Sequence, residues 1–506
     1  MISALMKCFF ILLFLPCSLM AQGPGGGYRN SRVYGDQTGV SCPPCGGSQL
    51  NSYSGNESIF PFSSNRFLCG NGANAASRDG NLLFYTNGWT LMDKNGNDIP
   101  GGDSLSPTPY SLSDIVYGGN NFTQNSFIFQ NSEDSSFYTM LHMTKWDASN
   151  NYGPLQVWKS IFKVNIDSSI SVTEKNTVIV NDTVEFSGII GCKHGNGRDW
   201  WSIIKNQFSN NYHTFLFTPD SMYSYLLPVS GTATFQFGSV GVFSPNGQYY
   251  ATYDNTTGLY IYSFNRCSGQ LTLLNNMPNP ANGTYLGPGL CFSPNSQYLY
   301  FNDLLRIWRM PLQSGLTPTD IELVQTNYQF TDSAIMFAGN YFNMELSNDG
   351  RIYIGNASSF RFFATIANPD AIDLANVGYA HWGAFQIPYF NNRTYNNNGF
   401  YTLGALPGSP CDTLGLSVGH LQISTPQINI SPNPNNGSFS INYTEQKIAG
   451  TVKVYDLNGQ LLYSEYVAPW SNAKELNLQN IVSNGMYALR LSFGDKTGVV
   501  KFVVKR

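Results

Sequence analysis

The chain has 506 residues, more than one ordinary hydrophobic core accommodates, so several domains or one large repeat array are expected. Charged residues make up only 11%, while hydrophobic residues reach 42% and aromatic residues 14%, a balance that excludes a disordered chain. The formal net charge is −4 and the sequence has no basic stripe, so nucleic acid is excluded as an expected partner.

The first 21 residues have the layout of a secretory signal peptide. One basic residue, Lys7, precedes the apolar run Cys8–Leu15, and the small residue Ala21 stands where a signal peptidase would cut. We therefore expect cleavage between Ala21 and Gln22. The apolar run is shorter than the roughly 20 residues that span a bilayer. No membrane span is expected in the mature protein.

Residues 22–66 form a segment rich in Gly, Ser and Pro ahead of the repeats. It contains the pair Cys42-Pro-Pro-Cys45, which no second CxxC or His cluster completes into a metal site. A local disulfide between Cys42 and Cys45 is the better interpretation, because an exported protein meets an oxidising compartment. Neither a metal nor a cofactor is expected.

An internal repeat dominates residues 67–415. Four tight turns of one kind, each followed at once by an apolar strand, begin at Ser77, Ser244, Ser293 and Ser347. The last three are spaced by 293 − 244 = 49 and 347 − 293 = 54 residues. Further turns at 132–135, 195–199 and 396–399 fit this spacing, which makes seven hairpins, and a third strand usually follows, as at Leu259–Phe264.

Short strands at a period near 50, with no convincing helix, predict an all-β fold. The expected architecture is a WD-repeat-like β-propeller of about seven four-stranded blades. Independent sandwich domains are the alternative, but they would need about twice this period. Within the propeller, Cys267 ends the third strand of one blade and Cys291 lies in the first strand of the next. We expect these two cysteines to form a disulfide between blades.

After a linker at 416–427, residues 428–506 follow a different pattern. The apolar residues Tyr487, Leu489, Leu491 and Phe493 alternate with Ala488, Arg490 and Ser492, as in a strand with one buried face. A small immunoglobulin-like β-sandwich is expected here.

Sequence blocks at four places in this tail suggest a family. They are Ser431-Pro-Asn-Pro-Asn-Asn-Gly437, Val454-Tyr-Asp-Leu-Asn-Gly-Gln-Leu-Leu462, Asn484-Gly-Met-Tyr-Ala-Leu489 and the final strand 499–506. With them the tail resembles the type A C-terminal sorting domains of type IX secretion in Bacteroidetes-type bacteria. A binding module of immunoglobulin type is the alternative, although its last strand need not end the chain.

The resemblance implies a partner, a destination and a processing step. The partner is the type IX secretion machinery, and the destination is the cell surface or the extracellular space, across the outer membrane. The tail would be removed as the protein is attached, which puts the mature C-terminus within 415–430. The propeller also resembles secreted proteins that carry such tails, through blocks such as 81–88 and 194–201. That second resemblance implies architecture and little chemistry.

Candidate site residues are few. His194, Arg198 and Asp199 form the densest titratable cluster, read either as an acid/base or anion-binding site or as an ion pair within a turn, and the second interpretation is favoured. Asp254 and Asp303 follow second strands, in loops that would form a polar rim suited to ligand or glycan contacts, or simply solvated turns. No catalytic residue is assigned.

These sequence patterns are consistent with two functions. The favoured one is a non-enzymatic surface or extracellular protein for binding and adhesion, with a glycan or a surface protein as ligand. The alternative is a secreted propeller enzyme, such as a lactonase, glycan lyase or hydrolase, with a site at the channel mouth. The sequence has no Gly-x-Ser-x-Gly elbow, no His-Glu-x-x-His site and no phosphate-binding glycine loop. Its five histidines are dispersed, at positions 142, 194, 213, 381 and 420.

Overall fold

The structure is a computed structural model. It describes residues 31–412 and 428–506, apart from 36–44, 52–57, 65, 67, 69–70, 78, 114–118, 121, 147–153, 186–187, 230–238, 255–256, 279–288, 313–316, 327–340, 357–359, 382–385, 392–394, 401, 458 and 495. The expected signal peptide and its Ala21–Gln22 cleavage point lie outside these residues. The chain divides into two compact units, Met1–Thr413 and Leu414–Arg506.

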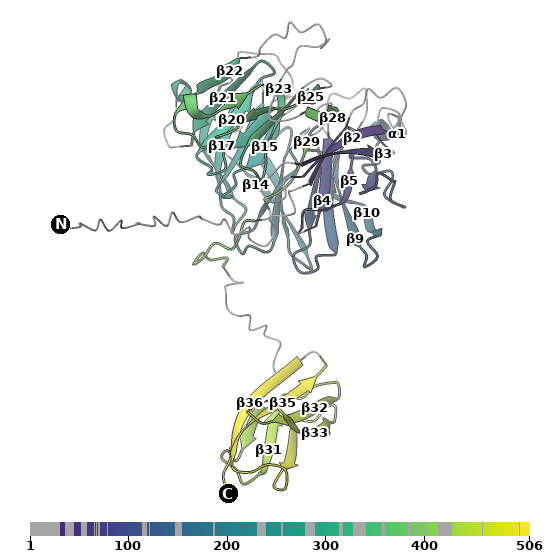
Figure 1. Ribbon diagram of the computed structural model, residues 1–506, viewed down its shortest axis with the longest axis vertical. Coiled ribbons are helices and arrows are strands. Elements are labelled where there is room, and N and C mark those ends of the chain that lie inside the picture. Colours follow the sequence, from purple (N-terminus) through teal and green to yellow (C-terminus); the bar gives the residue numbers. More distant parts are fainter. Residues whose placement is uncertain are drawn as a thin grey trace, which may run out of the picture. The chain divides into compact units, whose positions relative to one another are not determined.

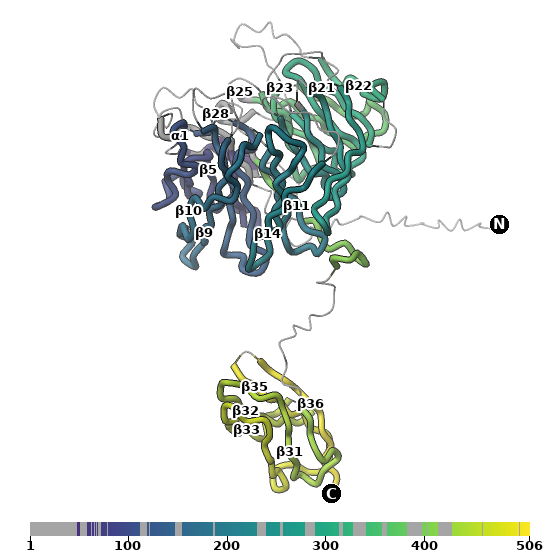
Figure 2. The backbone as a smooth tube through the Cα atoms, turned by 180° about the vertical axis from the view of Figure 1, so that it is seen from behind, coloured from purple at the N-terminus to yellow at the C-terminus, as the bar shows by residue number. Residues whose placement is uncertain are grey.

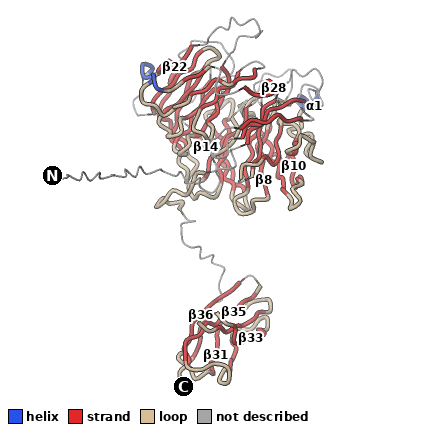
Figure 3. The backbone as a smooth tube through the Cα atoms, in the orientation of Figure 1, coloured by secondary structure: helices blue, strands red, loops and turns tan. Residues whose placement is uncertain are grey.

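The larger unit is built almost entirely from strands (Figures 1 and 3). Its described residues form six four-stranded sheets, which we number in chain order. The first sheet is β29 (Tyr395–Asn396), β4 (Asn71–Ala76), β5 (Leu82–Thr86) and β6 (Leu91–Asp93). The second is β7 (Ser126–Gln130), β8 (Phe137–His142), β9 (Gln156–Val164) and β10 (Ile170–Asn181), and the third is β11 (Ile190–Lys193), β12 (Trp200–Lys205), β13 (Asn211–Phe217) and β14 (Met222–Pro228).

The remaining sheets repeat this plan. The fourth is β15 (Val240–Phe243), β16 (Tyr249–Asp254), β17 (Gly258–Phe264) and β18 (Leu271–Met277). The fifth is β19 (Gly289–Phe292), β20 (Tyr298–Asn302), β21 (Arg306–Pro311) and β22 (Glu322–Thr326). The sixth is β23 (Tyr341–Leu346), β24 (Ile352–Asn356), β26 (Ala364–Ile366) and β27 (Tyr379–Ala380). The only regular α-helix of the described residues is α1 (Pro109–Ser113).

Successive sheets pack face to face around an axis, as in a β-propeller. Their first strands are neighbours, because β4 contacts β7, β11 contacts β15, β15 contacts β19 and β19 contacts β23. Apolar cores lie between consecutive sheets, for example Phe243 and Tyr250 of the fourth sheet against Ile203 and Tyr212 of the third. A strand between two such cores is buried on both faces, as all six residues of β12 are. The all-β propeller expected from the sequence is confirmed.

The turns between first and second strands form as the repeated motif predicts. The amide of Gly247 donates to the carbonyl of Ser244 at 2.8 Å, and Gly350 donates to Ser347 at 3.1 Å. Gly247 has φ +69° and Gly350 has φ +82°, a conformation that glycine adopts without steric cost. These turns place one end of every sheet on one side of the propeller, which we call the turn side. The opposite side, where second strands end, is the loop side.

The seventh predicted hairpin, at 396–403, is wrong. Tyr395–Asn396 pairs in parallel with β4, and 397–400 continue without regular strand structure. The sector between the sixth and first sheets instead contains a sheet from β1 (Ser31–Gly35), β2 (Cys45–Asn51) and β3 (Ser58–Ser64), with β25 (Phe360–Phe362) paired to β28 (Gln386–Asn391) beside it. Leu50 packs on Tyr353 of the sixth sheet, and Tyr85 of the first sheet donates to Ser64 at 2.8 Å.

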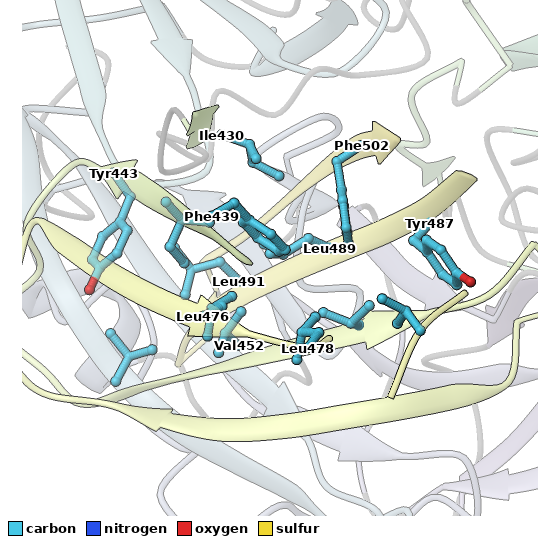
Figure 4. Packing of buried hydrophobic residues seen from close by; sticks show 14 of the residues in the cluster. Ile430, Phe439, Tyr443, Val452, Leu476, Leu478, Tyr487, Leu489, Leu491 and Phe502 are labelled. Carbon is cyan, nitrogen blue, oxygen red and sulfur yellow. The ribbon is translucent and has the colours of Figure 1, made fainter. Parts of the chain in front are cut away.

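The smaller unit is a sandwich of two sheets (Figure 2). One sheet has β30 (Ile428–Ser431), β31 (Ser438–Tyr443) and β34 (Ala473–Asn477). The other has β33 (Leu461–Val467), β32 (Gly450–Tyr455), β35 (Gly485–Phe493) and β36 (Lys496–Val504). Their inner faces share one core, in which the rings of Phe439 and Phe502 lie 4.6 Å apart (Figure 4). The expected C-terminal β-sandwich is confirmed; the finer domain limits stay predictions.

Candidate functional site

The axial channel of the propeller contains part of its own chain. At the loop side, the amide of Asn397 donates to Gly72 at 3.1 Å, and its carboxamide donates to Ser126 at 3.0 Å and to Ile189 at 2.5 Å. These three carbonyls lie on or beside three different first strands, and Asn397 is only 1% exposed. A cavity of about 50 Å³ remains, lined by β11, β15, β19, β23 and residues 397–400. Among the described residues, this cavity has room for water-sized groups.

The same segment leaves the channel at the turn side. There the amide of Leu406 donates to Gly195 at 2.7 Å, and Ala405 pairs with Asn196 as a β-bridge. The guanidinium of Arg266 donates to Gly404 at 2.7 Å and to His194 at 3.0 Å. Residues 395–400 and 402–412, the axial segment, therefore lead from one side of the propeller to the other.

A disulfide fixes the end of this segment. Cys267 bonds to Cys411, with 5.3 Å between their Cα atoms, across 144 residues of sequence. The predicted Cys267–Cys291 bridge is wrong, because Cys267, in the turn after β17, bonds to Cys411 instead, whereas Cys291 is buried in the core between the fifth and sixth sheets. Cys42 lies outside the described residues, so its pairing with Cys45 stays a prediction.

The cluster at 194–199 forms the turn between β11 and β12. The Asp199 carboxylate accepts from Arg198 Nε at 2.7 Å and from Asn196 Nδ2 at 2.8 Å. Arg198 also reaches Glu133 of the second sheet at 3.1 Å, and its hydrogen bond to Asp199 raises the pKa of its guanidinium. Asp199 is 3% exposed, so this carboxylate is saturated by partners inside the turn.

His194 takes part in the same turn rather than facing a ligand space. Its Nδ1 accepts from the amide of Asn196 at 3.1 Å, which places the proton on Nε2, 3.2 Å from the carbonyl of Cys267. The side chain is 8% exposed and its ring lies 5.5 Å from that of Trp201. These contacts connect the turn to the disulfide.

The other two candidate residues lie at the loop side, away from this cluster. Asp254 ends β16, opposite Gly258 in the register. Asp303, 1% exposed, accepts from the amides of Leu305 and Arg306 at 3.0 and 2.7 Å, so it closes the turn between β20 and β21. The fold brings His194, Arg198 and Asp199 together but not with Asp254 and Asp303.

The other described histidines lie in separate environments. His142 is fully buried between Ser106 Oγ at 2.8 Å and Ser160 Oγ at 2.9 Å, and burial lowers its pKa to about 3. His213 lies 3.6 Å from Asp182, and His381 contacts Tyr379. His420 lies outside the described residues. Among the residues that the structure places, no group of three or more His, Cys, Asp or Glu could hold a metal ion.

Sequence reasoning missed a groove between the second and third sheets. It has a volume of about 150 Å³ and opens at the turn side, beside the Arg198 turn. Its aromatic floor is formed by Phe129, Trp200 and Phe217, with Phe129 4.9 Å from Phe217. The polar residues around this floor are Gln130, Asn131, Ser132, Thr139, Lys159, Thr218, Asp220 and Ser221. The aromatic alternation along these strands was visible in the sequence, but the pairing of the two sheet faces was not.

One amine at the turn side has unusual surroundings. Lys193 Nζ donates to the carbonyl of Arg198 at 2.9 Å and lies 4.4 Å from the centre of the Trp200 ring. Burial lowers its pKa to about 8. Because its ammonium is held by a carbonyl and an aromatic face, it supports the turn that borders the groove.

Comparisons with known proteins found one family model and several solved structures. Residues 429–505 match the family model described as secretion system C-terminal sorting domain. Among curated proteins, no sequence matches the chain. Solved structures with a similar fold include a putative 6-phosphogluconolactonase from Bacteroides uniformis, at 13% identity and a TM-score of 0.43, covering 71% of this chain and 96% of that one.

Two further solved structures are similar at lower scores. The periplasmic gluconolactonase PpgL of Pseudomonas aeruginosa has 14% identity and a TM-score of 0.33, covering 70% of this chain and 88% of that one. The β-propeller domain of Cps50 (Swd1) from Myceliophteria thermophila has 9% identity and a TM-score of 0.31, with 76% and 97% covered. At such values the likeness concerns the fold and no residue of a site.

The tail is the part of the chain that the family model matches. Its blocks meet in space: Asn435 donates to Val503 at 3.0 Å, and Arg506 bonds to Asn484 and Asn436 at 2.9 and 3.2 Å. No helix of the described residues is long and apolar enough to cross a membrane. The protein is thus a β-propeller followed by a type IX secretion sorting domain, which marks it for export to the cell surface or the extracellular space.

Proposed function

We propose that the propeller is a non-enzymatic binding and adhesion module, which the tail delivers through the type IX machinery. The observation that carries the proposal is the contrast between two spaces. The cavity that the described residues leave at the axis has about 50 Å³ beside the chain's own residues 397–400. The groove between the second and third sheets offers about 150 Å³, with an aromatic floor and a polar rim.

The groove has the chemistry of a carbohydrate subsite. The three rings at its base are buried and leave only a small apolar area open, while amide, hydroxyl and charged groups around them can bond to hydroxyls. Lys159 Nζ lies 3.1 Å from Glu174, so it keeps donor capacity beyond that ion pair. We therefore propose an extracellular glycan as the ligand. A surface protein would need a larger interface than this groove provides.

The test compares groove variants of the secreted protein on glycan arrays. Lys159→Ala and Thr139→Ala should weaken binding about tenfold or more, corresponding to about 1.4 kcal/mol or more for a lost polar contact. Lys163→Ala is the matched control: Lys163 lies on the same strand but outside the groove, 5.1 Å from the ring of Phe137. Equal binding by all three variants would reject the groove as the site.

The same preparations test the enzyme alternative. They would be incubated with ester, lactone and glycoside substrates, and product formation measured. Turnover that is abolished by His194→Gln or by Asp199→Asn in protein of unchanged thermal stability would refute the binding proposal. It would place chemistry at the turn side.

A further inference from the structure

The third sheet of the propeller has an open outer edge. β14 is the last strand of this sheet, and among the described residues no strand pairs with its outer side. Its seven residues, Met222–Pro228, pair with β13 without a register shift, and none of them is charged. Tyr223, Tyr225 and Leu226 are 50%, 43% and 53% exposed. A regular, uncharged and exposed edge is a template on which a further strand can pair.

The outer strands of the other five four-stranded sheets each have a feature that hinders such pairing. β10, β18 and β22 have register shifts against the strands inside them, and bulges of this kind twist an edge away from a partner. β6 and β27 are protected by their length, which is three and two residues. Among these six sheets, as far as the structure describes them, β14 alone has neither feature.

The hydrogen bonds beyond the two ends of β14 show which of its backbone groups face β13. The amide of Thr218 donates to Ser221 at 2.9 Å, and the amide of Val229 donates to Asn210 at 2.8 Å. Both bonds join residues that continue the register of the two strands. In an antiparallel pair, residues that bond to the neighbouring strand alternate with residues that do not. The residues of β14 at odd positions therefore bond to β13.

The residues of β14 at even positions form the outer edge. Met222, Ser224 and Leu226 each direct an amide and a carbonyl away from β13, and Pro228 ends the row of donors because it has no amide. This row is symmetric about Ser224, since one donor and one acceptor lie two residues before it and two residues after it. An antiparallel strand with the same row of groups would bond to all of them.

We propose that β14 pairs with β14 of a second copy of this chain, in an antiparallel ladder centred on Ser224. In this register Met222 lies opposite the partner's Leu226, and Ser224 lies opposite its own copy, so three amides and three carbonyls of each strand are bonded. Tyr223 then lies beside the partner's Tyr225, and aromatic pairs of this kind stabilise adjacent strands. A two-fold axis relates the copies, as in most homodimers.

The complementarity of the edge to itself favours a second copy over an unrelated strand. A ladder centred on Leu226 would place Ser224 opposite the partner's Pro228, which has no amide to donate. A ladder centred on Met222 would place Ser224 opposite the partner's Asp220, which lies before the strand. Of these three registers, the one centred on Ser224 uses the whole edge. One strand edge is a small contact, so we expect a reversible dimer. This inference is independent of the glycan proposal.

Sedimentation velocity of the full chain measures this association. Between about 1 µM and about 200 µM, the wild type should change from monomer to dimer. Leu226→Lys places a charge on the edge and should raise the dissociation constant about tenfold or more. Leu274→Lys is the matched control, because Leu274 has the same exposure of 53% but lies on the bulged strand β18, so this variant should behave as the wild type. Circular dichroism checks that both variants are folded.

Cysteine cross-linking tests the register. Residues that exchange hydrogen bonds across an antiparallel ladder have Cα atoms about 5.5 Å apart, which a disulfide can span. Ser224→Cys should therefore form a covalent dimer on mild oxidation, seen on a non-reducing gel. In Leu226→Cys the two new thiols would be four residues apart along the ladder, about 13 Å, so this variant should stay as monomeric on the gel as the wild type.

Three results would overturn the proposal. A wild type that stays monomeric at the highest concentration would show that the edge does not pair with itself. A dimer that both lysine variants weaken equally, or that neither weakens, would place the contact elsewhere on the molecule. Cross-linking through Leu226→Cys but not through Ser224→Cys would reject the ladder centred on Ser224.

Discussion

The two units of this protein bury their strands in different ways. In the tail, β35 alternates: Tyr487, Leu489, Leu491 and Phe493 are buried, while Met486 and Arg490 are exposed. In the propeller, β12 is buried along its whole length, and only a fourth strand such as β14 is mainly exposed. A sandwich sheet has one face in the core, whereas a propeller sheet lies between two neighbours. The alternation of apolar and polar residues therefore predicts which side chains of a tail strand are buried. It does not do so for an inner strand of the propeller.

The units also differ in how their marked residues are placed. In the tail, blocks far apart in sequence converge, since Arg506 bonds to Asn436, Asn484 and Val482. In the propeller, the marked residues separate into the turn side and the loop side. The sequence motif of the tail therefore marks residues that meet in one compact structure. The repeats of the propeller instead mark the turns and strands of its scaffold. Four experiments test this difference between the two units.

The largest effect is expected from deleting residues 428–506. The propeller should stay folded, because the two units are compact separately, but surface display should be lost completely. Immunoblots of cell-surface and periplasmic fractions, with circular dichroism of the truncated protein, would measure this. Normal display of the truncated protein would contradict the role of the tail.

A core truncation in the tail should come next. Leu489 is 0% exposed, so Leu489→Ala should destabilise the sandwich by about 2–5 kcal/mol. The exposed Leu461, 47% accessible, gives the control Leu461→Ala, with a change below about 0.5 kcal/mol. Calorimetry of the full chain should show one shifted transition. If both transitions move together, the units are not energetically separate.

Lowering the pH should reduce the stability of the propeller through His142. Burial holds the pKa of His142 at about 3, below its ordinary 6.5, so the unfolded chain binds this proton first as pH falls. Stability from the neutral His142 is complete above about pH 6.5 and decreases toward pH 3. At pH 4.5 it should be about 2–3 kcal/mol lower.

The change His142→Gln isolates this contribution, since glutamine does not titrate. Urea unfolding between pH 4.5 and 7 should give the variant a shallower loss of propeller stability than the wild type. The tail transition should respond identically in both proteins. If the free energy of propeller unfolding changed with pH in parallel in the wild type and in His142→Gln, a neutral buried His142 would be ruled out.

The smallest effect concerns the axial segment. A Cβ at Gly399 would lie 2.7 Å from the Trp200 ring, so Gly399→Ala should cost about 1–3 kcal/mol through overpacking. Gly404, on the same segment, has nothing within 4 Å of such a Cβ, which makes Gly404→Ala the matched control. Thermal unfolding compares them. Equal melting temperatures would mean that residue 399 is not confined by the channel.

Gly399 also shows what could not be predicted from the sequence. Asn396-Asn-Asn-Gly399 has the composition of a hairpin turn, but its glycine is required by close approach to an aromatic ring, not by turn geometry. Likewise, Cys267 forms a disulfide as the sequence predicts, but its partner is Cys411 and not the predicted Cys291. Both errors concern the axial segment, whose neighbours come from several sheets.

The local structure follows from the sequence alone: the tight turns that begin at Ser77, Ser244, Ser293 and Ser347, the strands after them, and the tail with its sorting motif. These features depend on residues a few positions apart, through turn conformation, alternation and spacing. The folded structure was needed to find the course of residues 395–400 and 402–412, the Cys267–Cys411 bond and the groove between the second and third sheets. Each of these joins surfaces distant along the chain, and their meeting depends on how the sheets close around the axis, which local propensity does not encode.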